Sequence, residues 1–199
     1  MPNILHVGCG SATIAKMPDG FQDGSWQELR FDINPDYGVD FVGTMTDMSA
    51  VATDSVDALY SSHNIEHVFA HEVATVLREF RRVIKPDGFM VVTCPDLESV
   101  CKPIAEGRLT EPLYHSASGP ISPLDILYGH SAAIARGEVY MAHKTGFTRN
   151  TLGAVVQAAG FASLVARARP DKYDLWLVAT KSPVSNDRLV ELLDRYTRS

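Results

Sequence analysis

The stretch ILHVGCGSA, residues 4–12, predicts a short buried strand that runs directly into a turn containing two glycines. Gly8 and Gly10 suit a place where the chain turns sharply and where a ligand must approach the backbone closely. Many tight turns that bind nothing also carry two glycines, so this stretch alone leaves both interpretations open. The rest of the chain decides between them.

Short apolar segments alternate with amphipathic segments along the chain, which is the pattern of an α/β sheet. Further strands are predicted at residues 26–33, 39–43, 56–62, 88–95, 161–168 and 173–181. Helices are predicted between the fourth and fifth strands, over residues 148–160 and over residues 185–198. The first of these helices is the clearest, because its apolar residues recur at helical spacing on one face.

Residues 107 to about 147 do not follow this alternation. The segment is too apolar for a disordered linker and too rich in proline and glycine for a strand or a long helix. Connections this long inside a compact domain are usually functional. We therefore expect an inserted segment on the substrate side of the molecule.

Composition narrows the class of protein. The net charge is −6 and the chain has no long basic run, which disfavours nucleic acid as a partner. No apolar stretch approaches the roughly 20 residues that span a bilayer, so we expect no membrane association and a cytoplasmic location. The three cysteines form no C-x-x-C pair, and their neighbourhoods predict buried or near-core positions, with the thiols reduced.

The glycine spacing excludes a dinucleotide cofactor. Asp32 closes the second predicted strand about 20 residues after Gly10, where an acid accepts hydrogen bonds from ribose hydroxyls. A dinucleotide site requires a third glycine where this chain has Thr13, and a long first helix that Pro18 and Gly20 make implausible. The dinucleotide interpretation therefore fails, while a different ligand site and a simple tight turn both stay open.

Six motifs carry a resemblance to a known family: ILHVGCGSA, RFDINP, TDMS, VDALYSSHNIEHV, LREFRRVIKPDGFMVVTCPD and HKTGFTRNTLGAVVQAAGF. Their order resembles class I S-adenosylmethionine-dependent methyltransferases, and most closely the small proteins linked to sugar or polysaccharide modification. The resemblance implies a doubly wound, mostly parallel, seven-stranded Rossmann-like sheet with an antiparallel last strand. It also implies S-adenosyl-L-methionine as cofactor and one domain over residues 1–199, with the inserted segment at about 107–147.

The same resemblance implies roles for particular residues. In the family, the positions of Gly8 and Gly10 hold the methionine part of the cofactor, and those of Asp32 and Ile33 contact the ribose and the adenine. In the family, the positions of Asp47 and Met48 contact the edge of the adenine. The position of Ser62 lies where the cofactor and the substrate meet. One departure is His6, which stands where the family usually has an acid.

The chemistry of methyl transfer needs few protein groups. The cofactor's sulfonium already activates the methyl group, so the protein must align the acceptor and remove a proton if the acceptor is a hydroxyl. His63, at the end of the fourth strand, and His143, after the inserted segment, are the candidate catalytic residues. His67 and His130 are the other histidines considered for this role.

His63, Glu66 and His67 also form an H-x-x-E-H pattern, which is the spacing of an inverted zinc peptidase motif. Such a motif needs both histidines on one helical turn, whereas this pattern lies at a strand-to-helix turn. We therefore expect no metal, with Glu66 and His67 fixing the loop and capping the next helix.

The sequence thus favours methyl transfer to a small-molecule or sugar acceptor. A non-catalytic module that binds S-adenosylmethionine is the alternative, and His6 is the residue that favours it. The methylated atom and the oligomeric state are not determined by the sequence.

Overall fold

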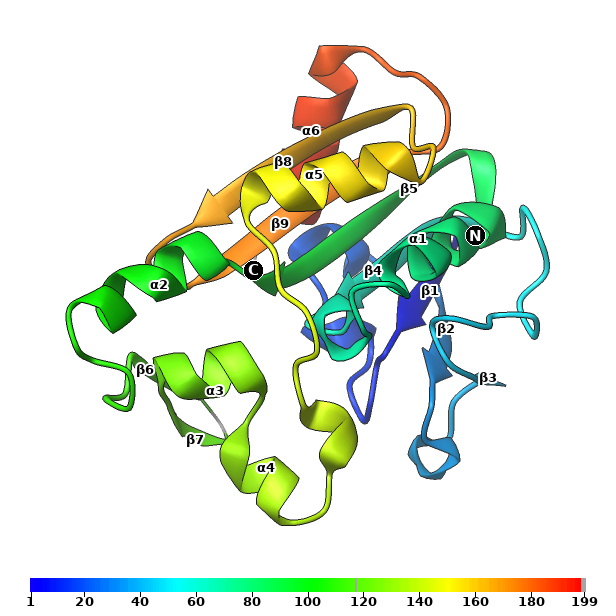
Figure 1. Ribbon diagram of the computed structural model, residues 1–199. Helices are drawn as coiled ribbons and strands as arrows, with labels where there is room; N and C mark the ends of the chain where they lie inside the picture. The colour runs from blue at the N-terminus through cyan, green and yellow to red at the C-terminus, as the bar shows by residue number, and fades with distance from the viewer. Residues whose placement is uncertain (117, 198–199) are drawn as a thin grey trace.

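The computed structural model describes residues 1–116 and 118–197, and its centre is a seven-stranded sheet (Figure 1). The strands lie in the order β3-β2-β1-β4-β5-β9-β8. Their bounds are β1 (Asn3–Val7), β2 (Gln27–Asp32), β3 (Phe41–Val42), β4 (Val56–Ser62), β5 (Ile84–Pro95), β8 (Ser163–Arg169) and β9 (Asp174–Thr180). Strands β1 to β5 pair in parallel, and β9 pairs antiparallel to both of its neighbours. The predicted fold class, including the antiparallel last strand, is confirmed.

Helices cover both faces of this sheet because side chains alternate along its strands. Leu59 of β4 joins a large core that includes side chains of α1 (Val73–Val83) and α5 (Arg149–Ala158). Its neighbours Ala58 and Tyr60 join a second core that includes side chains of α6 (Asn186–Tyr196). The central strands are therefore buried on both sides, as expected of a doubly wound sheet.

Side chains cap two of the helices, and the expected cap of α1 is not found. The side chain of Thr148 caps α5 in a capping box, and that of Ser185 caps α6. At α1 the N-cap residue is Glu72, which makes no capping bond with its side chain. The expectation that Glu66 or His67 caps this helix is therefore wrong, because those residues form a separate 3-10 turn, η4 (Ile65–His67).

The connection from β1 to β2 contains no long helix, as Pro18 and Gly20 predict. It holds two single 3-10 turns, η1 (Ile14–Lys16) and η2 (Asp19–Phe21). Phe21 is fully buried against Tyr196 of α6, so this short segment covers the sheet where a helix would otherwise lie. A further 3-10 turn, η3 (Pro35–Tyr37), follows β2.

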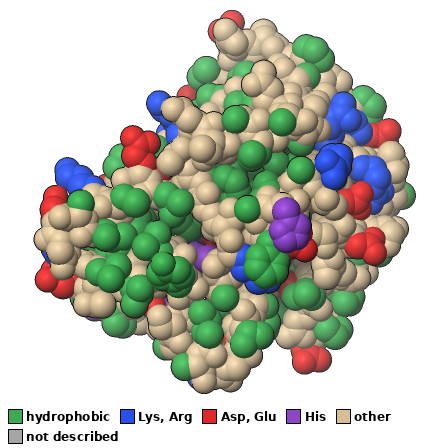
Figure 2. Space-filling model, viewed as in Figure 1, with side chains coloured by type: hydrophobic (Ala, Val, Ile, Leu, Met, Phe, Trp, Pro, Cys, Tyr) green, Lys and Arg blue, Asp and Glu red, His purple; other side chains and the backbone are tan. Residues whose placement is uncertain are grey.

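Residues 107–147, called the insertion below, fold into short elements beside α2 (Leu97–Ala105) (Figure 1). These are the hairpin β6 (Tyr114–Ser116) and β7 (Gly119–Ile121), α3 (Pro123–Tyr128), α4 (Ser131–Ala135) and η5 (Val139–Met141). Val100 of α2 packs with Ile121 and Ile126 in a small separate core. Figure 2 shows hydrophobic side chains gathered over α2 and α3 on the left of the molecule.

The structure tests two expectations that were drawn from the composition: the burial of the cysteines and the absence of a membrane-spanning segment. Cys9 and Cys94 are buried, but Cys101 is exposed on α2, so the predicted burial is wrong for this third thiol. Within residues 1–116 and 118–197, every helix is too short or too polar to cross a membrane.

The glycine turn after β1 depends on close packing against β4. Gly8 has a φ of +66°, and its N–H donates a hydrogen bond to the carbonyl of Phe31 at 2.8 Å. A Cβ added to Gly8 would lie 2.2 Å from the side-chain oxygen of Asn64. Only glycine therefore meets both requirements of this position, a left-handed backbone and a close neighbour.

Replacing Gly8 by alanine tests the packing requirement against a matched control. Gly24→Ala, at a φ of +80° with nothing within 4 Å of the added Cβ, imposes the backbone strain alone. We expect Gly24→Ala to cost about 1–2 kcal/mol, and Gly8→Ala to cost more because it adds the clash with Asn64. Urea unfolding measures both free energies, and equal losses would contradict the packing argument.

Candidate functional site

A cavity of about 420 Å³ lies at the carboxyl ends of the parallel strands. It is called the strand-end cavity below, and its walls come from the ends of β1, β2 and β4, the loop after β3, and the last part of the insertion. Strands β1 and β4 are neighbours in the sheet although β2 and β3 lie between them in sequence. The cavity thus lies where the strand order reverses, the usual ligand site of open α/β sheets.

The carboxylate of Asp32 organises the first wall of this cavity. One oxygen accepts a hydrogen bond from the N–H of Gly10 at 2.7 Å, and the other accepts one from the N–H of Asn34 at 2.9 Å. The side chain is buried yet lines the cavity. Ile33 lies beside it with 55% of its surface exposed, so a polar and an apolar group stand side by side.

The loop after β3 supplies Thr44, Met45 and Thr46 to the cavity in place of the predicted Asp47 and Met48. The side chain and the N–H of Ser49 interact with the Asp47 carboxylate and lower its pKa, and the Asp47 side chain does not line the strand-end cavity. Met48 is fully buried in the core. Neither expected adenine contact is therefore present in the cavity wall.

Helix α1 explains this placement. Glu79 accepts a hydrogen bond from the N–H of Met48 at 2.9 Å, and Arg82 donates to the carbonyl of Met48 at 2.8 Å and to that of Val51 at 2.9 Å. These bonds draw Met48 into the core and leave the residues just before it facing the cavity.

The end of β4 provides the opposite wall. Ser62 and His63 both line the cavity, and the Ser62 hydroxyl pairs with that of Thr93 at 2.8 Å. His63 has a φ of +54°, an uncommon backbone conformation for a non-glycine residue that is often found at functional sites. Asn64 donates from its amide to the carbonyls of Val7, at 3.1 Å, and Ser62, at 2.9 Å.

A second cavity of about 150 Å³ lies between the sheet and the insertion and is called the insertion cavity below. It shares three wall residues with the strand-end cavity: His63, His67 and Met141. Its other walls include polar side chains from several elements: Tyr114, Asp125, His130, His143, Lys172 and Tyr173. The two cavities are thus adjacent, and the wall between them includes the imidazoles of His63 and His67.

Glu66 lies beneath this wall with only 1% of its surface exposed. Its carboxylate oxygen is 3.4 Å from Nδ1 of His63. Burial acts to raise the pKa of Glu66, but pairing with His63 and the charges of His67 and His143 lower it below the usual value. Burial acts to lower the pKa of His63, and the pairing with Glu66 raises it overall.

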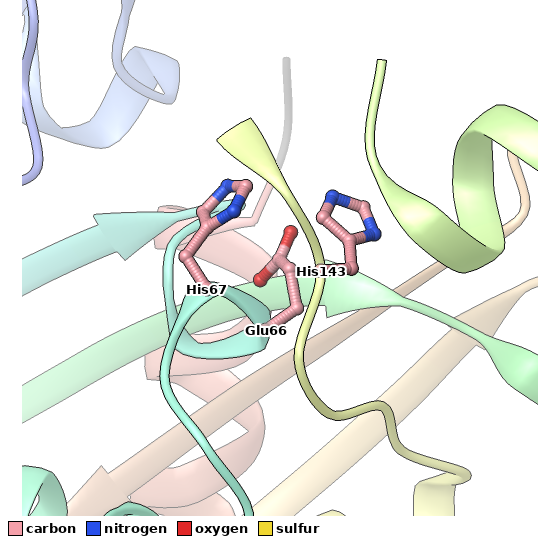
Figure 3. A group of neighbouring side chains, drawn as sticks. All are labelled: Glu66, His67 and His143. Carbon is pink, nitrogen blue, oxygen red and sulfur yellow. The ribbon is translucent and has the colours of Figure 1, made fainter. Parts of the chain in front are cut away.

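Figure 3 shows His67 and His143 on either side of the Glu66 carboxylate. The two imidazole rings meet edge to face with their centres 4.9 Å apart. Nδ1 of His143 is 2.7 Å from the carbonyl oxygen of Ile126, and burial lowers the pKa of His143. His143 lines the insertion cavity only, whereas the neighbouring Lys144 lines the strand-end cavity.

The structure brings together most of the predicted site residues. The strand-end cavity is lined by six of them: Gly8, Gly10, Asp32, Ile33, Ser62 and His63. Sequence reasoning did not single out Asn64, whose signal is an amide side chain directly after the strand end, or Lys144, which has no sequence signal. His6, the departure from the family pattern, is buried behind the glycine turn with Nδ1 2.8 Å from Glu28.

This geometry fits S-adenosylmethionine. The cavity volume lies within the range of small-molecule sites. Asp32 presents a carboxylate for ribose hydroxyls, Gly8 and Gly10 permit close approach of the ligand to the backbone, and Phe31, Ile33 and Met45 supply apolar surface for an adenine ring.

Comparisons with known proteins agree with this fit. Residues 5–92 match a family model described as a methyltransferase domain. Among curated proteins, none matches the chain in sequence.

Similar folds occur in solved structures with 13–15% sequence identity, a likeness that concerns the fold alone. The PH0226 protein of Pyrococcus horikoshii is 15% identical, with a TM-score of 0.60 over 90% of this chain and 81% of that one. A Thermotoga maritima protein described as an S-adenosylmethionine-dependent methyltransferase, possibly a histamine N-methyltransferase, is 15% identical, with a TM-score of 0.56 over 91% and 82%. DhpI, in a structure with S-adenosylhomocysteine, is 13% identical, with a TM-score of 0.56 over 92% and 78%.

The glycine turn, the acid at the end of β2 and the order of the seven strands, together with the matched family model, lead to one conclusion. Residues 5–92 match a methyltransferase domain, and the chain has the fold of solved S-adenosylmethionine-dependent methyltransferases.

Proposed function

We propose that this chain is an S-adenosylmethionine-dependent methyltransferase that acts on a small-molecule or sugar acceptor bound in the insertion cavity. The observation that carries the proposal is the shared wall of His63, His67 and Met141 between the two cavities. A methyl group must pass from the cofactor to an acceptor held in line with the methyl–sulfur bond, so the two sites have to adjoin.

The size and lining of the insertion cavity support a small polar acceptor. About 150 Å³ accommodates a sugar ring or a molecule of similar size, and no long polymer segment fits inside. Tyr114, Asp125 and Lys172 offer hydrogen-bond donors and acceptors, while Ile121 and Ile126 offer apolar contacts. The net charge of −6 favours this class of acceptor over nucleic acid.

His63 is the residue best placed to act in the transfer step. It lines both cavities, and half of its side-chain surface is exposed. It therefore stands where the acceptor meets the cofactor and is close enough to take a proton from the attacking group. His143 lies on the acceptor side of the wall, and its role is to position the acceptor.

Replacing Asp32 by alanine tests the cofactor site. The variant loses the carboxylate that faces the cavity and holds the N–H of Gly10, and hydrogen bonds to charged groups contribute about 1.5–3 kcal/mol each. We expect S-adenosylhomocysteine to bind at least tenfold more weakly by calorimetry. Asp36→Ala, an exposed carboxylate on the same loop, is the control and keeps native affinity. Native affinity in Asp32→Ala would refute the assigned role.

Replacing His63 by alanine tests the transfer step. We expect the rate of S-adenosylhomocysteine formation, with an acceptor found in a panel of monosaccharides, polyols and phenols, to fall about 10²–10⁴-fold. Binding of S-adenosylhomocysteine changes little, because most of the cavity wall remains. His71→Ala, an exposed histidine before α1, retains full activity.

The same assay separates an enzyme from a non-catalytic binding module. Methyl transfer to an acceptor of the panel supports the proposal. Cofactor binding with no transfer to any of them favours the binding module.

A further inference from the structure

A buried carboxylate without a hydrogen-bond partner stands out in the wall between the two cavities. Within residues 1–116 and 118–197, both side-chain oxygens of Glu66 are buried and neither has a hydrogen-bond partner. The closest titratable atom, Nδ1 of His63, is 3.4 Å away. An ionised carboxylate removed from water costs several kcal/mol unless a positive charge compensates it. The imidazole of His63 supplies such a charge at 3.4 Å, and the carboxylate oxygens, which form no hydrogen bond with the described residues, are free to bind a metal ion as well.

Three potential metal ligands converge there. One oxygen of Glu66 and one ring nitrogen each of His67 and His143 lie within 4.8 Å of one another. Figure 3 shows that the two imidazoles flank the carboxylate from opposite sides. His143 comes from the end of the insertion, and the N–H of Lys144 donates to the carbonyl of Glu66 at 2.8 Å, which fixes the two segments together.

The contacts of His143 match those of a metal-bound imidazole, whereas those of His67 must change when an ion binds. A histidine that binds a metal through one nitrogen usually donates its other N–H to a carbonyl or carboxylate. Nδ1 of His143 is 2.7 Å from the carbonyl oxygen of Ile126, which leaves Nε2 free. In His67, Nδ1 lies 3.2 Å from the carbonyl oxygen of Ala142 and Nε2 lies 3.1 Å from that of His63. Both ring nitrogens of His67 thus face carbonyl oxygens, and binding of an ion requires the ring to rotate and give up one of these two contacts.

We propose that Glu66, His67 and His143 bind a divalent first-row transition-metal ion. Two imidazoles and one carboxylate form the donor set of many catalytic zinc and non-haem iron sites, which keep further coordination positions open. Ligand atoms around one such ion lie roughly 3.3 Å apart, so small side-chain rotations close the present cluster. The open positions face the insertion cavity, because all three ligands line it.

The ligands of this proposed ion differ from those that the H-x-x-E-H pattern suggests. That pattern would use His63 and His67 as ligands and Glu66 as a base, on one helical turn. In the structure His63 has a left-handed backbone, and the clustered donors are Glu66, His67 and the distant His143. The carboxylate is thus a ligand, and the second imidazole comes from the insertion.

The proposed ion narrows the class of acceptor, an extension that rests on the function proposed above. A divalent ion lowers the pKa of a hydroxyl group that it binds and makes the oxygen a better nucleophile. The acceptor's O–H bond breaks and His63 takes the proton; the oxygen then bonds to the methyl carbon as the carbon–sulfur bond breaks, releasing S-adenosylhomocysteine. An acceptor with two adjacent hydroxyls, as in a sugar diol or a catechol, can occupy two open positions.

Metal titration of the full chain tests the site without any acceptor. After treatment with a chelator, calorimetry with Mn²⁺ and separately with Zn²⁺ is expected to show one ion per chain. Glu66→Gln and His143→Ala should each weaken binding at least tenfold. Mn²⁺ is included because the exposed thiol of Cys101 favours Zn²⁺ far more than Mn²⁺.

His130→Ala is the matched control, since His130 lines the same cavity outside the donor cluster, and it should bind the ion normally. S-adenosylhomocysteine binding by each variant checks that the fold is intact. If Glu66→Gln does not fold, His143→Ala carries the test alone because His143 is only partly buried.

The outcomes separate the two proposals. Absence of saturable binding, or equal binding by the native chain and both ligand variants, overturns the metal site; the charge opposite Glu66 is then that of the His63 imidazole. Metal binding without methyl transfer to any hydroxylated acceptor supports the metal site and refutes the proposed function instead.

Discussion

The side-chain amide of Asn64 joins the ends of the two strands between which the site forms. It donates to the last residue of β1 and the last residue of β4, and it packs directly against Gly8. The glycine turn and the turn at His63 therefore keep a fixed separation. Both turns line the strand-end cavity, so under the proposed function this separation sets the distance between the cofactor and the group that acts on the acceptor.

Much of the fold can be predicted from the spacing of apolar residues in the sequence. Alternating apolar segments predict the strands, and the periodic apolar face of residues 73–83 predicts α1. Pro18 and Gly20 correctly exclude a long helix after β1. Helix α2 is absent from the prediction because its segment is short and contains Pro103, which weakens any helical pattern.

The site is predicted only where it depends on local sequence. Asp32 and the glycines are set by their positions at strand ends, and the structure places them at the cavity. The misplaced Asp47 and Met48 depend instead on Glu79 and Arg82, which lie 30 or more residues away. The burial of Glu66 among histidines likewise depends on the return of the insertion to η4, which no local pattern encodes.

The insertion ends by contributing Tyr140, Met141 and Lys144 to the strand-end cavity, while its earlier residues line the insertion cavity. One continuous segment therefore lines both cavities. A shift of this segment moves the walls of both cavities at once. If the acceptor binds as proposed, a substitution here that admits a different acceptor also changes the affinity for the cofactor.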